Sequence, residues 1–341
     1  MNIEKRYELI ERNTQEILEP DLLREILQKK DKPVVYLGTS VTGKPHIGYF
    51  MWVNKMIDFL DAGFQVKILL ADLHGALDNT PWDLLEKRYQ YYEIVIKGLF
   101  KTLGYERDIE FVKGSSFQLT KEYIYDVYRF STIASVHDAL KATSEIVKQS
   151  ENPKVSGLIY AIMQALDEVY LNADVQLGGN DQRKVFVFAH EYLPKLGYDA
   201  RVHILLPLIP SFSQAGKMSS SDKSSKIDLI DDEKTVIEKM KKAYCPEGIV
   251  ENNGVIIFLK YVIFEIKRRR KEKFIIERPE KWGGTLEYDN YELFEKDFIE
   301  KKVHPFDVKL ALAKEINKLI APIREDVMKH EKLIREAYPN E

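Results

Sequence analysis

The stretch that decides the fold is PVVYLGTSVTGKPHIG, residues 33–48. Its first six residues are apolar, rich in β-branched side chains and closed by a glycine, which predicts a short buried strand. A turn rich in glycine and polar residues follows, and a helix is predicted to begin near Pro45–His46. A helix that follows a strand in this way presents backbone N–H groups and a positive dipole end to an anion. The stretch therefore predicts a phosphate-binding turn at the end of a buried strand.

Buried strands recur beyond this stretch. They are predicted at QVKILLAD (65–72), IEFVKG (109–114), DVQLGG (174–179) and RVHILLPL (201–208). Between the first two, Thr80–Asp83 predicts a helix start with Thr80 as its cap, and that helix is predicted to run to about residue 103. Strands that alternate with helices at this spacing predict an α/β fold with a Rossmann-like, doubly wound parallel sheet.

The remaining segments are predicted to be mostly helical. Residues 1–30 are predicted as helices, and residues 120–170 as a helical block inserted between the two halves of the sheet. After about residue 230 the pattern is again mostly helical, with one apolar run, FIIERP. We therefore predict a larger α/β domain at residues 1–230 and a smaller, mostly helical C-terminal domain at residues 231–341.

Composition places the chain among ordinary globular proteins, with 341 residues of which 45% are hydrophobic. No apolar stretch approaches the roughly 18 residues that span a bilayer, and the charged start, MNIEKRYELIERN, lacks an apolar signal core. No membrane association and a cytoplasmic location are therefore expected. The single cysteine, Cys245, excludes an internal disulfide and a multi-cysteine zinc site. A net charge of −3 argues against wholesale binding to nucleic acid but allows a local basic surface.

The turn at residues 38–48 resembles a P-loop only superficially. Gly43 and Lys44 match, but a P-loop needs Ser or Thr next, and Pro45 has neither a hydroxyl nor an amide hydrogen. His46-Ile47-Gly48 explains the turn better. An imidazole can donate a hydrogen bond to a phosphate as negative charge builds in a transition state. Glycine at position 48 allows an adenine or ribose to approach the backbone.

A second motif, Gly216-Lys217-Met218-Ser219-Ser220-Ser221, follows the last predicted strand of the sheet. Together with His46-Ile47-Gly48 it resembles the HIGH and KMSKS signatures of class I aminoacyl-tRNA synthetases, in the KMSSS form. The resemblance implies that Lys217 places a positive charge on the phosphates of ATP. Two positions depart from the signatures, since Tyr49 replaces a histidine that touches the ribose and Ser220 replaces the second lysine. The resemblance implies ATP contacts at Gly38, His46, Gly48, Gly178, Asp181, Leu206, Lys217 and Met218, with His46, Gly48, Lys217, Ser219 and Ser220 as catalytic positions.

An apolar helix predicted around residues 159–167 carries Tyr160, Gln164 and Asp167 at positions i, i+4 and i+7. This spacing places all three on one helix face, where they either line a pocket or form a buried hydrogen-bond network. The pattern YxxxQxxD resembles the tyrosine-binding helix of tyrosyl-tRNA synthetases. That resemblance implies that Asp167 and Tyr36 bind the phenolic hydroxyl of the substrate. It also implies that Tyr160, Gln164 and Gln182 hold the ammonium group and that Ala71, His74 and Gln118 complete the pocket.

Tryptophanyl-tRNA synthetase is the nearest alternative within the class. A tryptophan pocket does not need a hydroxyl partner at Tyr36 together with Asp167, so these residues favour tyrosine. A site built to bond a hydroxyl rejects an analogue that lacks one, an effect for which tyrosyl-tRNA synthetases are the standard example. Two further alternatives are a different adenylyl-transferring enzyme and a synthetase-like RNA-binding protein without catalysis. The serine-rich motif and the tyrosine-helix residues speak against the first. Against the second speak the intact residues His46, Gly48, Lys217, Gln164 and Asp167.

The C-terminal domain carries two segments, RPEKWGG (278–284) and HPFD (304–307), that resemble anticodon-binding segments of the archaeal and eukaryotic enzymes. The resemblance implies that Trp282 stacks on the first anticodon base and that Asp307 accepts its hydrogen bonds. The implied contacts with tRNA(Tyr) are Arg183, Lys184, Trp282, His304, Pro305 and Asp307. The basic run Lys267–Lys273 has two open interpretations, a phosphate contact and a solvated helix end.

The resemblance covers about residues 33–325. It implies an enzyme that activates L-tyrosine with ATP and loads it onto tRNA(Tyr), with residues 1–230 as catalytic domain and residues 231–341 as anticodon-binding domain. The helical insertion at about 120–150 matches the dimer interface of the family, which implies a homodimer. Mg²⁺ is expected to accompany ATP, held by phosphates and water, because no dedicated carboxylate cluster for a metal is found.

Overall fold

A six-stranded sheet forms the centre of the molecule. The computed structural model describes residues 1–146, 152–213, 218 and 226–339. The strands are β1 (Glu16–Leu18), β2 (Val34–Ser40), β3 (Gln65–Ala71), β4 (Ile109–Lys113), β5 (Val175–Gly179) and β6 (Val202–Leu206), in the order β1-β6-β5-β2-β3-β4. All neighbours pair in parallel except β1, which is antiparallel to β6. The predicted doubly wound α/β fold is confirmed.

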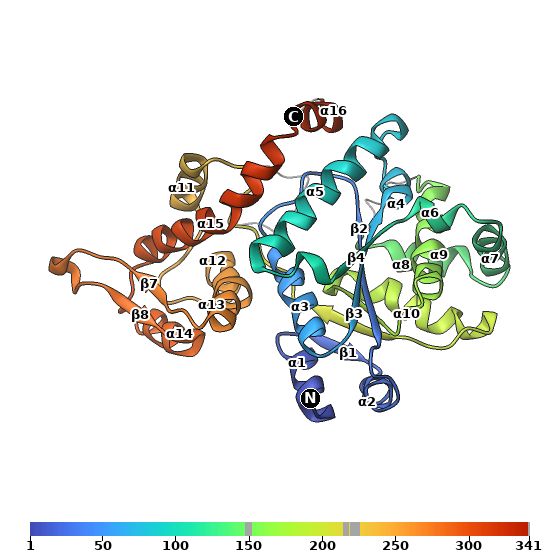
Figure 1. Ribbon diagram of the computed structural model, residues 1–341, viewed down its shortest axis with the longest axis horizontal. Coiled ribbons are helices and arrows are strands. Elements are labelled where there is room, and N and C mark those ends of the chain that lie inside the picture. The colour runs from blue at the N-terminus through green and yellow to red at the C-terminus, as the bar shows by residue number, and fades with distance from the viewer. Residues whose placement is uncertain (147–151, 214–217, 219–225, 340–341) are drawn as a thin grey trace.

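Strand β2 shows why these residues form a central strand. Its side chains alternate, so that Val35 and Leu37 enter one hydrophobic core and Tyr36 points to the opposite side. Helices α3 (Tyr49–Asp61) and α5 (Leu85–Leu103) pack on the face that Val35 and Leu37 share (Figure 1). Helices α9 (Val155–Tyr170) and α10 (Arg183–Tyr192) form a second hydrophobic core on the other face. The chain runs from β2 to β3 and β4 on one side and later to β5 and β6 on the other. This reversal between β2 and β5 is a topological switch point, where open α/β sheets bind ligands.

The predicted helical block between the sheet halves is present on either side of residues 147–151, which lie outside the described residues. It consists of α7 (Lys121–Ser131), α8 (Val136–Thr143) and α9 (Val155–Tyr170). The other helices of this part are α1 (Ile3–Glu11), α2 (Pro20–Lys29), α4 (Asp72–Leu77), η1 (Trp82–Leu84), η2 (Glu106–Asp108), α6 (Ser115–Gln118), η3 (Asn180–Gln182), α10 (Arg183–Tyr192) and η4 (Pro194–Leu196).

The C-terminal part is mostly helical, as predicted, and includes one small sheet. The apolar run at 274–279 begins with β7 (Phe274–Ile276), which pairs antiparallel with β8 (Leu286–Tyr288). The helices are α11 (Glu233–Lys242), α12 (Gly254–Phe258), η5 (Leu259–Ile263), α13 (Phe264–Arg270), η6 (Glu280–Trp282), α14 (Tyr291–Ile299), α15 (Pro305–Met328) and α16 (Glu331–Ala337). One continuous hydrophobic core joins this part to α3 and α5. Among the described residues no helix is both long and apolar enough to cross a membrane.

Three local predictions were wrong. The first thirty residues are not only helical, because Glu16–Leu18 forms the edge strand β1, whose three residues are too few to show a period. The helix after the first strand begins at Tyr49 rather than near Pro45–His46, since His46 is held in a bridge to Asp228. Thr80 does not cap the next helix, because its hydroxyl donates to the carbonyl of Val41 at 3.4 Å.

Candidate active site

Two adjoining cavities of about 290 Å³ each occupy the crevice at the carboxyl ends of β2 and β5. Tyr49 and Asp181 line both, so one ligand can extend from the first cavity into the second. Among the predicted residues, the first cavity is lined by Tyr36, Gly38, Ala71, His74, Tyr160, Gln164, Asp167, Asp181 and Gln182. The second is lined by His46, Gly48, Asp181, Leu206 and Met218. The structure thus brings residues that lie far apart in the sequence to one edge of the sheet.

His46 reaches the second cavity as a neutral hydrogen-bond donor. Burial, with a smaller effect of the Lys226 ammonium, lowers the pKa of His46 to about 3, so the imidazole is uncharged at neutral pH. Its Nδ1 accepts the backbone N–H of Gly48 at 3.2 Å, which leaves the hydrogen on Nε2. The packing around Gly48 leaves no room for a side chain at this position. A Cβ there would lie 2.8 Å from His46 Cε1 and 3.2 Å from Met218 Sδ.

Asp167 forms the buried end of the first cavity. The residue is 1% exposed, and Oδ1 accepts hydrogen bonds from Tyr123 Oη at 2.7 Å and Gln118 Nε2 at 2.8 Å. Its Oδ2 lies 3.8 Å from His74 Nε2. Burial raises the pKa of Asp167 to about 8, while the two hydrogen bonds partly offset that shift. Gln118, predicted to line the pocket, lines neither cavity and instead bonds Asp167 from within the protein. Tyr123 gives Asp167 a second such bond, which the sequence did not indicate.

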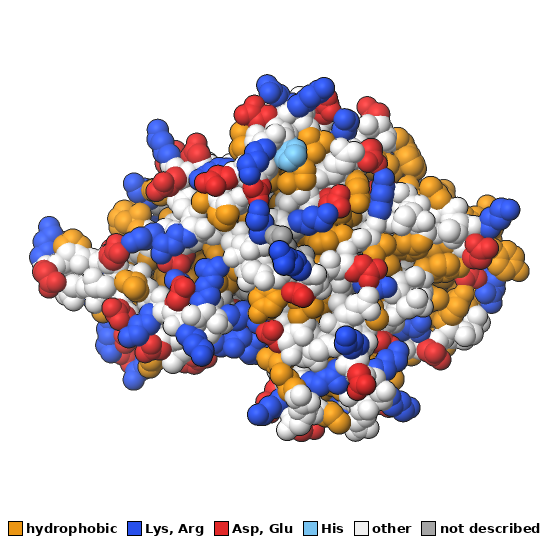
Figure 2. Space-filling view, in the orientation of Figure 1, with side chains coloured by type: hydrophobic (Ala, Val, Ile, Leu, Met, Phe, Trp, Pro, Cys, Tyr) orange, Lys and Arg blue, Asp and Glu red, His pale blue; other side chains and the backbone are white. Residues whose placement is uncertain are grey.

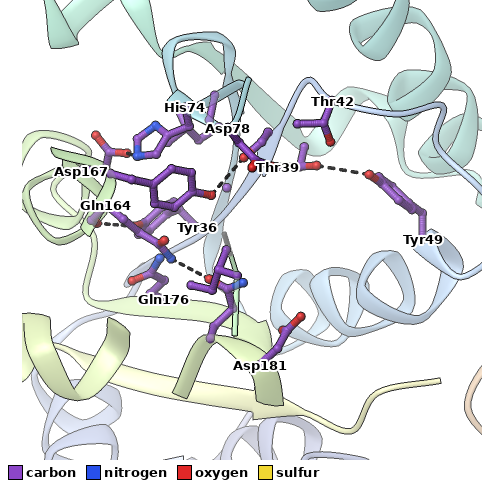
Figure 3. A pocket seen from close by; sticks show the side chains of 17 residues that line it. Tyr36, Thr39, Thr42, Tyr49, His74, Asp78, Gln164, Asp167, Gln176 and Asp181 are labelled. Atoms are coloured by element: carbon purple, nitrogen blue, oxygen red, sulfur yellow. Dashed lines mark hydrogen bonds and ion pairs between the residues drawn. The ribbon is translucent and has the colours of Figure 1, made fainter. Parts of the chain in front are cut away.

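Other predicted residues complete the lining of this cavity, and Figure 3 labels Tyr36, His74 and Gln164 among them. Gln164 Nε2 donates to Gln182 Oε1 at 2.9 Å, and the hydroxyl of Tyr160 lies 3.1 Å from Ser40 Oγ. Tyr36 Oη donates to the carbonyl of Gln164 at 3.5 Å. Tyr160, Gln164 and Asp167 do share one face of α9, and that face is turned to the cavity. Of the two alternatives for this helix, the structure therefore agrees with the one in which the three side chains line a pocket.

Several polar atoms at this cavity lack a hydrogen-bond partner among the described residues. They are Gln164 Oε1, Gln176 Oε1 and His74 Nε2, each buried. A buried polar atom without a partner costs about 1–3 kcal/mol, so these atoms favour a polar ligand in the cavity. Gln176 was missed by sequence reasoning, although a glutamine inside the apolar strand β5 was a usable signal. Asp78, which also lines the cavity, was missed because no pattern around it points to a site.

Some predicted ATP contacts are placed differently or not described. Gly178 lines neither cavity, and a Cβ there would lie 2.6 Å from Phe186 Cζ, so this glycine is explained by packing. Gly38 lines the first cavity and not the second. Lys217, Ser219 and Ser220 lie outside the described residues.

Comparison with known proteins agrees with this geometry. A family model described as tRNA synthetases class I (W and Y) matches residues 28–321. The chain belongs to this family. It is 49% identical to the cytoplasmic tyrosine–tRNA ligase of Gallus gallus, an alignment that covers 99% of this chain and 64% of that protein. It is also 42% identical to the tyrosine–tRNA ligase of Natronomonas pharaonis, with 99% of both chains covered.

Among solved structures, the chain is similar to the tyrosyl-tRNA synthetase of Archaeoglobus fulgidus complexed with L-tyrosine. The two share 36% sequence identity and a TM-score of 0.88, over 96% of this chain and 100% of that one. The resemblance to the archaeal and eukaryotic tyrosine enzymes is therefore confirmed. The chain spans just under two thirds of the length of the Gallus gallus relative, at 64%.

In this class I synthetase chain, the positions predicted to contact tRNA lie in three places. Arg183 and Lys184, at the start of α10, are ion-paired with Glu16 at 2.7 Å and Glu145 at 2.8 Å. Trp282 is 66% exposed, which leaves an aromatic face open to solvent. His304 caps α15 by accepting the backbone N–H of Phe306 at 3.2 Å, and Pro305 and Asp307 occupy the first turn of that helix.

Proposed function

We propose that the chain is a tyrosine–tRNA ligase, which activates tyrosine with ATP and transfers the tyrosyl group to the 3′ end of tRNA(Tyr). The observation that carries the proposal is the continuity of the two cavities. A cavity whose buried end holds Asp167 opens, past Tyr49 and Asp181, onto a cavity that contains His46. A tyrosyl group in the first cavity therefore has its carboxylate directed toward a nucleotide in the second.

The first cavity suits tyrosine at both ends. At the buried end, Asp167 Oδ2 and the hydroxyl of Tyr36 would be partners for a phenolic hydroxyl. Toward the opening, the oxygens of Gln164, Gln176 and Tyr160 accept hydrogen bonds from an ammonium group. The complex of the Archaeoglobus fulgidus relative with L-tyrosine supports the same ligand here.

Activation requires positioning and charge stabilisation rather than a covalent enzyme intermediate. The tyrosine carboxylate attacks the α-phosphorus of ATP in line, which forms tyrosyl-adenylate and releases pyrophosphate. The Nε2–H of His46 donates to a phosphate oxygen as charge builds, and Lys217 supplies a full positive charge. Mg²⁺ would accompany ATP, held by its phosphates and water, and would add positive charge at the phosphates.

Transfer follows when the terminal ribose hydroxyl of tRNA attacks the carbonyl carbon of the adenylate and AMP leaves. We assign residues 1–230 to catalysis and residues 231–341 to the anticodon. Trp282 would stack on the first anticodon base, with Asp307 as hydrogen-bond acceptor and His304 and Pro305 shaping that helix start. Arg183 and Lys184 would contact the acceptor stem. The cytoplasmic naming of the relatives supports a cytoplasmic location.

A homodimer is supported by exposed apolar side chains on the inserted helices. Leu119, Tyr125, Tyr128 and Val136 are each more than 60% exposed, although all are large and apolar. Figure 2 shows hydrophobic side chains gathered at this end of the molecule, over α7 and α8. Contiguous apolar surface of this kind is typical of protein–protein contacts. Sedimentation of the purified protein at several concentrations tests the assembly.

ATP–pyrophosphate exchange with tyrosine, tryptophan and phenylalanine in parallel tests the activity. Exchange with tyrosine alone supports the activation reaction and the assignment of the tyrosine pocket. Exchange with tryptophan alone keeps the reaction and overturns the roles given to Tyr36 and Asp167. A folded protein that shows no exchange with any of the three in the presence of Mg²⁺ overturns the proposed function.

A further inference from the structure

The basic run Lys267–Lys273 contains one arginine that fits neither a phosphate contact nor a solvated helix end. The side chain of Arg269 is only 13% exposed and forms ion pairs with Asp58 and Asp61 of α3. Its Nη2 also donates to the backbone carbonyl of Asn54 at 3.2 Å. Arg268, by contrast, is 45% exposed and pairs with Glu265 of its own helix at 3.0 Å. Figure 2 shows the Lys and Arg side chains gathered around α13.

Arg269 belongs to a cluster of six charged side chains at the junction of α3, α13 and the end of α1, with Lys55 and Asp58 buried at its centre and Asp61 at its exposed rim. The cations are Arg12, Lys55 and Arg269, and the carboxylates are Asp58, Asp61 and Glu265. Within it, Arg12 pairs with Asp58 and lies 3.5 Å from Glu265. Lys55 is 2% exposed, and burial lowers its pKa to about 8. Buried ion pairs fix the relative position of the helices that carry them, because moving the helices apart would leave a buried charge without a partner.

A second contact joins the same two helices next to this cluster. The π-helical turn η5 leads directly into α13, and the side-chain amide of Asn54 donates to the carbonyls of Val262 at 3.3 Å and Tyr261 at 3.4 Å. A π-helical turn interrupts the regular hydrogen bonding of an α-helix. Asn54, on the other side of the junction, donates to two of the backbone carbonyls of this turn. The junction is therefore polar and directional rather than only apolar.

Helix α3, on one side of the junction, leads to the proposed active site, and helix α13, on the other side, leads to the proposed anticodon site. Helix α3 starts directly after Gly48, so it shares a rigid segment with the loop that carries His46. Helix α13 runs into β7 and, soon after, into η6, which ends at Trp282. Coupling between distant sites needs such a chain of packed, rigid elements.

We propose that this cluster holds the C-terminal part at the angle that lets one tRNA reach both sites, and that Arg269 is a positioning residue for tRNA charging. The proposal rests on the proposed function. It does not involve tyrosine activation, because none of the six charged residues lines either of the two active-site cavities.

The variant Arg269→Gln tests it, with Arg268→Gln as matched control from the same run. Three rates are compared with the unchanged protein: tyrosine-dependent ATP–pyrophosphate exchange, charging of full-length tRNA(Tyr), and charging of a minihelix that carries only the acceptor stem. We expect Arg269→Gln to lower kcat/KM for full-length tRNA by about tenfold. Exchange and minihelix charging should stay unchanged, and Arg268→Gln should change none of the three.

The outcomes separate the possible failures. Equal losses on full-length tRNA and on the minihelix would indicate general destabilisation and overturn the proposal, as would full-length charging that is unaffected. Absence of exchange in the unchanged protein would instead refute the proposed function. Should Arg269→Gln not fold, Arg269→Lys keeps the charge but cannot bond two carboxylates with one planar fork, so a smaller loss confined to full-length tRNA is expected.

Discussion

Two buried aspartates in this molecule have neighbours of opposite kinds. Asp167 is 1% exposed and Asp58 is 4% exposed, so both carboxylates are almost fully withdrawn from water. Asp167 is bonded by the neutral groups of Tyr123 and Gln118. Asp58 is surrounded by the cations Arg12, Lys55 and Arg269. Burial raises the pKa of both, and only at Asp58 do neighbouring cations oppose the shift.

The same residue type therefore serves two purposes in this protein. A carboxylate held by neutral donors keeps one oxygen and much of its hydrogen-bonding capacity for a ligand, at a cost in stability. A carboxylate neutralised by cations holds helices together and has little left to offer a ligand. Identical substitutions at the two positions should therefore affect different properties, and the stability effects should have opposite signs.

Asp58→Asn should give the largest effect. Removing this charge leaves three buried cations with only Asp61 and Glu265, and we expect a loss of about 3–5 kcal/mol in the free energy of unfolding. Urea denaturation at pH 7 measures it. Asp61→Asn is the matched control, because that carboxylate is 36% exposed and should cost less than about 1 kcal/mol. A loss at Asp58 no larger than at Asp61 would contradict the structural role of the cluster.

Asp167→Asn should give the next largest effect, on activity. The amide retains an oxygen as acceptor for Tyr123 and Gln118 but replaces the second oxygen, the partner of a phenolic hydroxyl, by an NH2 group, so kcat/KM for tyrosine in pyrophosphate exchange should fall by about 100-fold. KM for ATP should stay the same. Asp126→Asn serves as control, since that carboxylate is also buried, binds Tyr170 at 2.9 Å and lines neither active-site cavity. Equal losses from both variants would contradict a specific role for Asp167.

Elements with a local period were predictable from the sequence. The alternation of buried strands with helices gave the doubly wound sheet, and the helical spacing of Tyr160, Gln164 and Asp167 placed them on one face of α9. The loop with His46 followed from its place between a strand and a helix. Each of these features is encoded within a few turns of chain.

Features that depend on distant partners were not predictable. The sequence left Arg269 between a phosphate contact and a solvated helix end, because its partner Asp58 lies 211 residues away in the sequence. Tyr123 supports Asp167 from α7, and nothing in the spacing of α7 indicates that contact. The strand β1 forms because Leu205 and its neighbours on β6 offer a free edge, which three residues cannot signal alone. The features that could not be predicted therefore depend mostly on contacts between residues far apart in the sequence.

The smallest of the three effects concerns the pH dependence of stability at Asp167. The pKa of this carboxyl is about 8 in the folded protein and 3.8 as an ordinary aspartate, so the folded state binds the extra proton between about pH 4 and pH 8. Stability contributed by this group is therefore complete below pH 4 and is lost as the pH rises toward 8. Asn cannot ionise and avoids this loss.

Asp167→Asn should accordingly be more stable than the unchanged protein at pH 9, by about 1–2 kcal/mol, as expected when a strained functional site is relieved. The difference should shrink as the pH is lowered and vanish near pH 4. Thermal or urea unfolding of the two proteins across this range, each without tyrosine, measures it. A variant that is less stable at pH 9, as Asp58→Asn is expected to be at pH 7, would mean that Asp167 is held by its neighbours as firmly as Asp58. The contrast between the two carboxylates would then have to be abandoned.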